Sequence, residues 1–177
     1  MVSINIYKNR IEYTYGQHLH RTDGPAREYY SKYSCLNIKR EWYFNGKLHR
    51  EDGPAVEYYE GYEEYWIYNQ QHRENKHAIE IGKGHHEYWL FNSLHREDGP
   101  AIICCDGHKE WFHYGFLHRE DGPARKYEDR DEYYQYSKRH SEDGPAVEYA
   151  DGQKEYWFCG IKYTHEEYLT LIKLDKL

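Results

Sequence analysis

The sequence predicts an all-β protein, an elongated single-sheet array of about seven antiparallel β-hairpin repeats with a short C-terminal capping helix. Three observations predict it. A loop of the form LHRxDGPA recurs along the chain, most copies are 23 residues apart, and two short aromatic-rich runs separated by a turn follow each copy. Because short repeats of this kind bury their surface against neighbouring repeats, we expect one repeat domain over residues 1–177.

The loop occurs six times, and its Asp position marks the period. Close copies begin at Leu19, Leu48, Leu94 and Leu117, and degenerate copies begin at Gln71 and Arg139. The marker positions are 29, 23, 23, 23 and 22 residues apart, and they are Asp23, Asp52, Asn75, Asp98, Asp121 and Asp143. Residues 19–163 therefore hold six repeats, and residues 1–18 form an N-terminal hairpin in which Ile6 faces Ile11.

Each repeat is expected to contain one β-hairpin. In one repeat the turn is Asp151-Gly152, a dipeptide that accepts positive φ at both central positions of a type I′ turn. This turn sets Glu148 opposite Glu155. The same register pairs like charges in two other repeats, Glu57 with Glu64 and Glu80 with Glu87. Extra residues at 30–39 lengthen one tip, and the repeat around Asp129-Arg130 is one residue short.

The last segment, residues 164–177, predicts a helix. Thr164 can act as the N-cap, and Glu167 stands three residues later in the spacing of a capping box. Leu169, Ile172 and Leu174 follow as an apolar series. This helix is expected to cap the end of the repeat array.

A 23-residue hairpin repeat with glycine turns and aromatic strands resembles the MORN repeat superfamily. The closer likeness is to its divergent NGklHRxDGPA variety, similar to YwqK-type antitoxin-like repeats and to repeat proteins of large DNA viruses. The resemblance extends from Ile4 to about Lys162. It implies a single long twisted antiparallel sheet or half-pipe that acts as a scaffold and carries little chemistry.

The polar loop residues have a structural interpretation. A catalytic group is assembled once, whereas this loop is copied six times, so no catalytic residue is expected and the chain is predicted not to be an enzyme. In Asp-Gly-Pro, Asp bonds the local backbone, Gly takes a special dihedral and Pro leads into a strand. Arg is expected to bridge the paired glutamates. The predicted structural loop residues are His49, Arg50, Asp52, His95, Arg96, Asp98, His118, Arg119 and Asp121.

Two chemical alternatives are disfavoured by the repetition. A glycosidase uses one unequal pair of carboxylates in a cleft, whereas these pairs recur. Residues 23 apart on successive hairpins stand about 10 Å apart, whereas zinc needs ligands within about 2 Å of one ion. Neither the loop histidines nor His85-His86 therefore predict a metal site, and no cofactor is expected.

Composition excludes further classes. The net charge is −7 and no dense Lys/Arg run occurs, so nucleic acid is not an expected partner and a membrane surface is disfavoured. The N-terminus lacks a long apolar run, and no stretch of 18 apolar residues occurs. The cysteines, Cys35, Cys104, Cys105 and Cys159, have no CxxC spacing, which favours reduced thiols and a cytoplasmic location.

The 22 Tyr, 5 Trp and 5 Phe residues suggest the function, because such rings often anchor protein interfaces. We expect a non-enzymatic scaffold that binds a protein partner. Stacking that only stabilises the sheet is an equal alternative, and others are antitoxin-like inhibition, capture of a small ligand or lipid headgroup, or a cryptic hydrolase. A polar cluster that is not repeated would favour the last two. The Ile4 and Ile6 edge can support an end-to-end homodimer. Candidate binding residues are Trp66, Trp89, Phe112 and Trp157, with Tyr68 and Phe91 two positions later.

Overall fold

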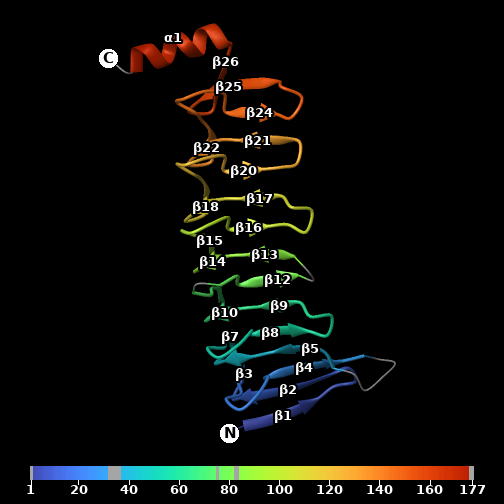
Figure 1. Ribbon diagram of the computed structural model, residues 1–177. Helices are drawn as coiled ribbons and strands as arrows, with labels where there is room; N and C mark the ends of the chain where they lie inside the picture. Colours follow the sequence, from blue (N-terminus) through green and yellow to red (C-terminus); the bar gives the residue numbers. More distant parts are fainter. Residues whose placement is uncertain (1, 32–36, 75, 82–83, 176–177) are drawn as a thin grey trace. The chain divides into compact units, whose positions relative to one another are not determined.

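The computed structural model describes residues 2–31, 37–74, 76–81 and 84–175. Cys35, Asn75, Lys83 and the centre of the 30–39 insertion lie outside these residues. The chain forms two compact units, Met1–Ser93 (unit 1) and Leu94–Leu177 (unit 2). In each unit, antiparallel hairpins follow one another in chain order (Figure 1). The predicted fold class is confirmed, since the chain is all-β with a C-terminal helix.

The described part of unit 1 contains four long hairpins. They are β1 (Val2–Ile6) with β2 (Arg10–Tyr15), β4 (Arg27–Tyr30) with β5 (Asn37–Glu41), β8 (Val56–Tyr58) with β9 (Glu63–Glu64), and β12 (Ile79–Ile81) with β13 (His85–Glu87). Each hairpin pairs with the next through β2–β4, β5–β8 and β9–β12, and the short β3 (His18–Leu19) also pairs with β2. The four hairpins thus form one antiparallel sheet.

The described part of unit 2 contains three long hairpins. They are β16 (Ile102–Ile103) with β17 (Lys109–Glu110), β20 (Arg125–Lys126) with β21 (Arg130–Glu132), and β24 (Val147–Tyr149) with β25 (Lys154–Phe158). They join through β17–β20 and β21–β24. Strand β26 (Ile161–Tyr163) pairs with β25 and leads into helix α1 (His165–Asp175).

Helix α1 begins at the capping box that the sequence predicts. The N–H of Glu167 donates to Thr164 Oγ1 over 3.3 Å, and the Glu167 carboxylate accepts the N–H of Thr164 over 2.8 Å. These two bonds satisfy backbone donors that an uncapped first turn leaves free.

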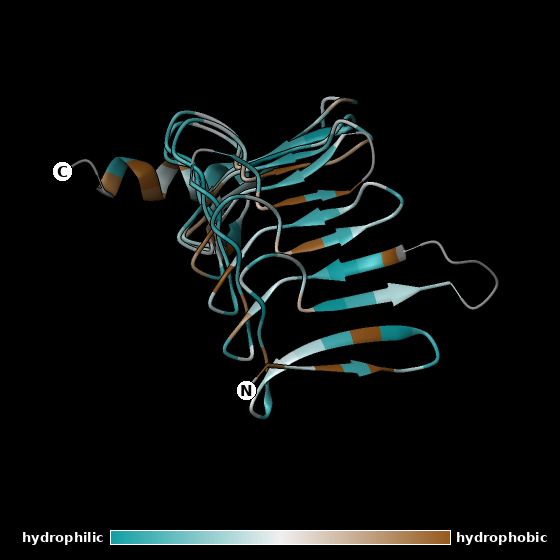
Figure 2. Cartoon of the chain, turned by 90° about the horizontal axis from the view of Figure 1, so that it is seen from below, coloured by the Kyte–Doolittle hydropathy of each residue, from teal (hydrophilic) through white to brown (hydrophobic). Residues whose placement is uncertain are grey.

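The chain forms a second, shorter hairpin after most of the long ones, and this element was not predicted. Its strands are β6 (Tyr43–Phe44) and β7 (Lys47–Leu48), β10 (Trp66–Ile67) and β11 (Gln70–Gln71), β14 (Trp89–Leu90) and β15 (Ser93–Leu94), β18 (Phe112–His113) and β19 (Phe116–Leu117), and β22 (Tyr134–Gln135) and β23 (Lys138–Arg139). Within unit 1, Figure 2 shows the short hairpins leaving the long strands in a different direction.

The tips of the short hairpins are two-residue turns of type I′. Both residues have positive φ, for example 48° at Asn45 and 78° at Gly46. Asn-Gly is the strongest sequence signal for such a turn, so this hairpin could have been found from Asn45-Gly46. At the equivalent tips an aromatic residue takes the left-handed conformation, as Tyr68 does with φ of 49°.

The long hairpins are shifted by one residue from the predicted register. The N–H of Tyr149 donates to the Gln153 carbonyl over 3.0 Å, so the tip is a three-residue loop in which Gly152 has a φ of 88°. Glu148 consequently pairs with Lys154, not with Glu155. The same shift pairs Val56 with Glu64, Glu57 with Glu63, Ile79 with Glu87 and Glu80 with His86.

This shift makes the predicted glutamate pairs wrong. A step of one residue moves a side chain to the other face of a sheet, so Glu57 and Glu64 lie on opposite faces. The predicted register of the N-terminal hairpin is correct, because Ile6 pairs with Ile11. In the shortened repeat the Tyr127 N–H donates to the Arg130 carbonyl, so the turn is Glu128-Asp129, one residue before the expected Asp129-Arg130.

Alanine occupies the corner where each loop enters its long strand. Six of these alanines have 0% exposure; they are Ala26, Ala55, Ala78, Ala101, Ala124 and Ala146. Their backbone bonds both neighbouring strands. The Ala55 N–H, for example, donates to Glu64, and the Ala55 carbonyl accepts from Trp42. A larger side chain has no room at this corner, which explains the last letter of the repeated LHRxDGPA loop.

Candidate functional site

The repeated loop is closed by its own arginine. Arg119 Nε donates to Asp121 Oδ1 over 2.7 Å, and a terminal nitrogen donates to the Pro123 carbonyl over 3.4 Å. Its guanidinium lies 4.2 Å from the centre of the Trp111 ring, a cation–π arrangement. Arg50 repeats this geometry with Asp52, Pro54 and Trp42. The predicted loop residues are therefore brought together within each loop.

The expected bridge between two glutamates is only half present. Arg50 lies 2.9 Å from Glu57 Oε1, but Glu64 is on the other face of the sheet. The arginine instead joins Glu57 to Asp52.

The structure gives a different reason for glycine at this loop position from the one that the sequence predicted. Positive φ does not occur at Gly53 or Gly122, so no special dihedral is needed there. A Cβ on Gly53 would lie 2.8 Å from Arg50 Cζ, and one on Gly122 would lie 3.1 Å from Arg119 Cζ. The guanidinium therefore packs directly on the glycine backbone, and a side chain at this position would force the arginine to move.

The loop histidines connect successive repeats. His95 stacks on the tip ring of Tyr114 with centroids 4.1 Å apart, and its Nδ1 accepts the Tyr114 N–H over 3.2 Å. Burial and the neighbouring His113 hold the pKa of His95 below its usual value, so its neutral form is favoured. Similar stacking joins His49 to Tyr68, His72 to Phe91, and His118 to Tyr136.

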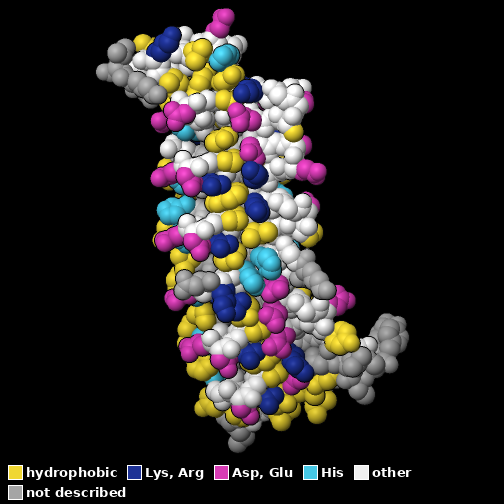
Figure 3. Space-filling view, in the orientation of Figure 1, with side chains coloured by type: hydrophobic (Ala, Val, Ile, Leu, Met, Phe, Trp, Pro, Cys, Tyr) yellow, Lys and Arg dark blue, Asp and Glu magenta, His cyan; other side chains and the backbone are white. Residues whose placement is uncertain are grey.

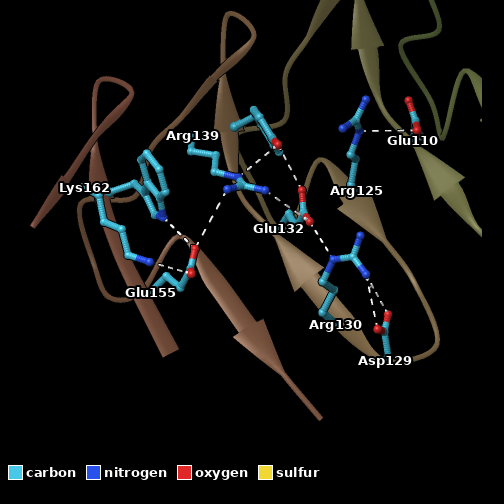
Figure 4. Close-up of polar contacts among 10 residues, drawn as sticks. Glu110, Arg125, Asp129, Arg130, Glu132, Arg139, Glu155 and Lys162 are labelled. Carbon is cyan, nitrogen blue, oxygen red and sulfur yellow. Dashed lines mark hydrogen bonds and ion pairs between the residues drawn. The ribbon is translucent and has the colours of Figure 1, made fainter. Parts of the chain in front are cut away.

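A row of glutamates lies on the sheet face opposite to the loop arginines. In unit 2, Arg130 Nε donates to Glu132 Oε1 over 2.6 Å, and Tyr134 donates to Oε2 over 2.9 Å (Figure 4). The Glu132 side chain is only 3% exposed. Burial raises its pKa, but the bonds from Arg130 and Tyr134 and the charge of Arg139 outweigh burial, so the pKa of Glu132 lies below its ordinary value.

The candidate tryptophans belong to this glutamate row. The indole N–H of Trp66 donates to Glu64 over 2.7 Å, and Trp89 and Trp157 make the same bond to Glu87 and Glu155. All three rings are half-buried. Phe112 occupies the same position without a donor. The three indoles stabilise the sheet through these bonds, and Phe112 is half-buried as well, so the four rings offer only part of their surface to a partner.

The short-hairpin tips expose more aromatic surface. Tyr68 is 48% exposed and Phe91 is 53% exposed in unit 1, while Tyr114 and Tyr136 are 54% and 58% exposed in unit 2. Tyr68 and Phe91 are among the predicted binding residues. They are more exposed than the predicted tryptophans, which are half-buried. Large exposed rings at repeated positions are the accessible part of the aromatic array.

Each unit has a groove between two successive loops. In unit 1 a groove of about 770 Å³ is lined by residues that include Asp52, Pro54, Tyr65, Glu74 and Phe91. In unit 2 a groove of about 700 Å³ is lined by the equivalent residues, which include Asp98, Pro100, Trp111, Glu120 and Tyr136. Each unit therefore has its own groove of the same kind, in which carboxylates and a tip ring are among the lining residues. We call the loop carboxylates and tip rings together the loop–tip surface.

The last loop is closed differently. Ser141 replaces the arginine, and the hydroxyl of Tyr168 from α1 accepts the Gly144 N–H and donates to the Ser141 carbonyl, each over 3.1 Å. Tyr168 is 3% exposed and lies against Tyr156. The helix therefore caps this loop through one buried side chain.

Comparison of the chain with protein-family models and with curated proteins gives no match. Among the described residues, no helix has the length and apolar character needed to cross a membrane. Among the described cysteines, Cys104, Cys105 and Cys159 are in no disulfide bond.

Proposed function

We propose that the chain is a non-enzymatic repeat scaffold that binds a protein partner, and that the partner presents basic side chains to the loop–tip surface. The observation that carries this proposal is the recurrence of one groove type in both units, lined by carboxylates, aromatic rings and loop arginines. Arg50, Arg96 and Arg119 are already bonded to an aspartate of their own loop, so the exposed loop glutamates remain to attract a cation. The likeness to MORN repeats supports a scaffold role.

Charge complementarity favours a basic partner. Glu97 and Glu120 side chains are 81% and 87% exposed, and each lies 3.7–3.8 Å from a histidine nitrogen of its own loop, His95 and His118. The neighbouring exposed rings can accept Lys or Arg on their faces. With a net charge of −7, the chain attracts cationic segments over distances of about a Debye length.

Repetition supplies affinity. Successive hairpins within a unit are about 10 Å apart, so an extended segment can contact several loops at once. Each contact is weak by itself, but linked contacts raise the overall affinity well above that of one.

The test is affinity capture from source cells, followed by titration of the captured partner. The double variant Tyr68→Asn/Phe91→Asn removes two tip rings, and Asn suits positive φ, as Asn45 shows at the equivalent tip. The control is Tyr59→Asn, which removes a ring that is 69% exposed outside the loop–tip surface.

We expect the double variant to bind at least about 10-fold more weakly, the control to bind normally, and added salt to weaken binding. Unchanged affinity of a folded double variant would contradict the proposal, as would a partner whose binding ignores salt. Loss of binding in Tyr59→Asn as well would place the interface elsewhere.

A second candidate concerns strand β1 in unit 1. It pairs with β2 on one side, and Val2, Ile4 and Ile6 are 63%, 59% and 77% exposed. We propose that this edge pairs with the edge of a second copy of the chain. Light scattering over a concentration series should show a dimer that Ile4→Lys abolishes; a monomer at every concentration would contradict it.

A further inference from the structure

One repeat in unit 1 carries a cluster of metal-ligating side chains. Ligand atoms of His77, Glu80 and His86 all lie within 4.8 Å of one another. His77 Nε2 is 2.9 Å from Glu80 Oε2, and the His77 and His86 rings are 4.5 Å apart. Figure 3 shows a group of histidine side chains over β12 and β13 on the face in view.

The backbone register fixes this arrangement. Glu80 in β12 pairs directly with His86 in β13 and, on its other side, with Glu63 in β9. Residues directly opposite in neighbouring strands point to the same face, so three polar side chains meet there. His77 precedes β12 and reaches the cluster from the loop.

The cluster is not part of the repeat pattern. His77 stands where five other loops have proline, in the one loop that reads QHRENKHA. At the position of His86, other repeats have Arg40, Glu63, Lys109, Asp131 and Lys154. The repetition that argues against chemistry in the loops therefore does not apply here.

The surroundings favour a cation. Glu63 adds a second carboxylate beside Glu80, while the nearby Arg73 directs a terminal nitrogen to the His77 carbonyl and its guanidinium onto the Tyr65 ring, 3.6 Å from the centroid. The Nδ1 of His86 is buried and makes no hydrogen bond with the described residues. A nitrogen lone pair without a protein partner is costly unless another ligand uses it.

We propose that His77, Glu80 and His86 bind one divalent transition-metal ion of the zinc type. Two imidazoles and one carboxylate suit zinc, with bonds of about 2.0–2.2 Å, and such bonds in a tetrahedral site put donor atoms about 3.3–3.6 Å apart. The ligand atoms already lie within 4.8 Å of one another, so the cluster is close to that separation. Three protein ligands leave a fourth position for water.

The test is titration of the tag-free full chain with Zn²⁺ by calorimetry and with Co²⁺ by absorption. We expect one site per chain. His77→Ala and His86→Ala should each weaken it by at least about 10–100-fold, the range caused by loss of even an outer-shell partner, and Glu80→Gln should weaken it as well. Circular dichroism and melting temperature establish that each variant folds; His86→Gln serves if His86→Ala does not.

The matched control is His85→Ala. His85 precedes His86 directly, but it lies on the other face and contacts Glu87 over 2.9 Å, so its loss should leave metal affinity unchanged. A second group in unit 2, Cys104, Asp106 and His108, is distinguished by its thiol, because a sulfur ligand adds a charge-transfer band to the Co²⁺ spectrum. The proposal would be overturned if the wild type binds no metal, or if folded His77→Ala and His86→Ala bind metal as tightly as the wild type. It would also be overturned if Cys104→Ser abolishes the Co²⁺ spectrum.

Discussion

Two loops of unit 2 have the same backbone and different closures. In both the loop at 117–124 and the loop at 139–146, the N–H of the third residue donates to the carbonyl of the next repeat, Arg119 to Tyr134 and Ser141 to Trp157. The first is closed by Arg119 and the second by Tyr168. The loop therefore needs a side chain that hydrogen-bonds to its backbone. The chain can supply that side chain from the loop itself, as Arg119, or from a separate helix, as Tyr168.

The difference also explains why α1 stands at the end of the repeats. A loop that carries its own arginine is self-contained, whereas the loop with Ser141 depends on residues that follow in the chain. Terminal repeats of repeat proteins commonly need such a cap, because one side of their surface has no neighbour.

The largest expected effect comes from removing Tyr168. Tyr168→Ala should destabilise unit 2 by about 3–5 kcal/mol, because it empties a buried aromatic site. Tyr168→Phe should cost about 1–3 kcal/mol, since it leaves the Gly144 N–H and the Ser141 carbonyl without their partner. Urea denaturation measures both. Leu169→Ala on the exposed side of α1 should change stability by less than about 0.5 kcal/mol. Equal effects at positions 168 and 169 would show that α1 does not close the loop.

Removing an arginine should have a smaller effect. Arg119→Met should cost about 1–3 kcal/mol, because it loses its bonds to Asp121 and the Pro123 carbonyl and its place over Trp111. In unit 1, Glu57→Gln should restore part of the loss caused by Arg50→Met, since Arg50 pairs with Glu57. Lys126→Met, at an exposed position, is the control. If Arg119→Met unfolds like the wild type, the arginine does not hold the loop.

Acidification should slightly weaken the arginine-closed loop and the start of α1. Hydrogen bonding to Arg119 holds the pKa of Asp121 below its ordinary value, and hydrogen bonds from the Thr164 backbone and hydroxyl do the same for Glu167 at the start of α1. A depressed pKa gives stability that is present above the unfolded-state value, about 3.9 for Asp and 4.3 for Glu, and lost as pH falls through the folded one. Denaturation from pH 7 to 3 should show this loss, and Asp121→Asn or Glu167→Gln should flatten it; identical curves would contradict these linkages.

Much of the fold was predictable because it is carried by local, repeated signals. The LHRxDGPA period predicted the hairpin series, and Thr164 with Glu167 predicted the start of α1. The register of the long hairpins was not predictable, because Asp151-Gly152 fits both a two-residue turn and the last two positions of a three-residue loop. That one residue decides which face each glutamate occupies.

The candidate site was predictable only in part. Tyr68 and Phe91 were found from their spacing, but whether a ring is exposed depends on contacts such as the bond from Trp66 to Glu64, which the register decides. The cluster of His77, Glu80 and His86 was missed for the same reason. Its members are scattered over ten residues, and only the observed pairing of β12 with β13 brings them together.

The most direct test of the account is a comparison of the two loop glycines. Gly122→Ala places a Cβ 3.1 Å from Arg119 Cζ, whereas a Cβ on Gly144 meets nothing within 4 Å, and neither glycine has positive φ. We predict that Gly122→Ala destabilises unit 2 by about 1 kcal/mol, and that Gly144→Ala is neutral or stabilising by up to about 1 kcal/mol. In an Arg119→Ser background the cost of Gly122→Ala should disappear. Equal losses of stability at both glycines, or a loss at Gly122 that persists without Arg119, would contradict the claim that the arginine closes the loop by packing on its backbone.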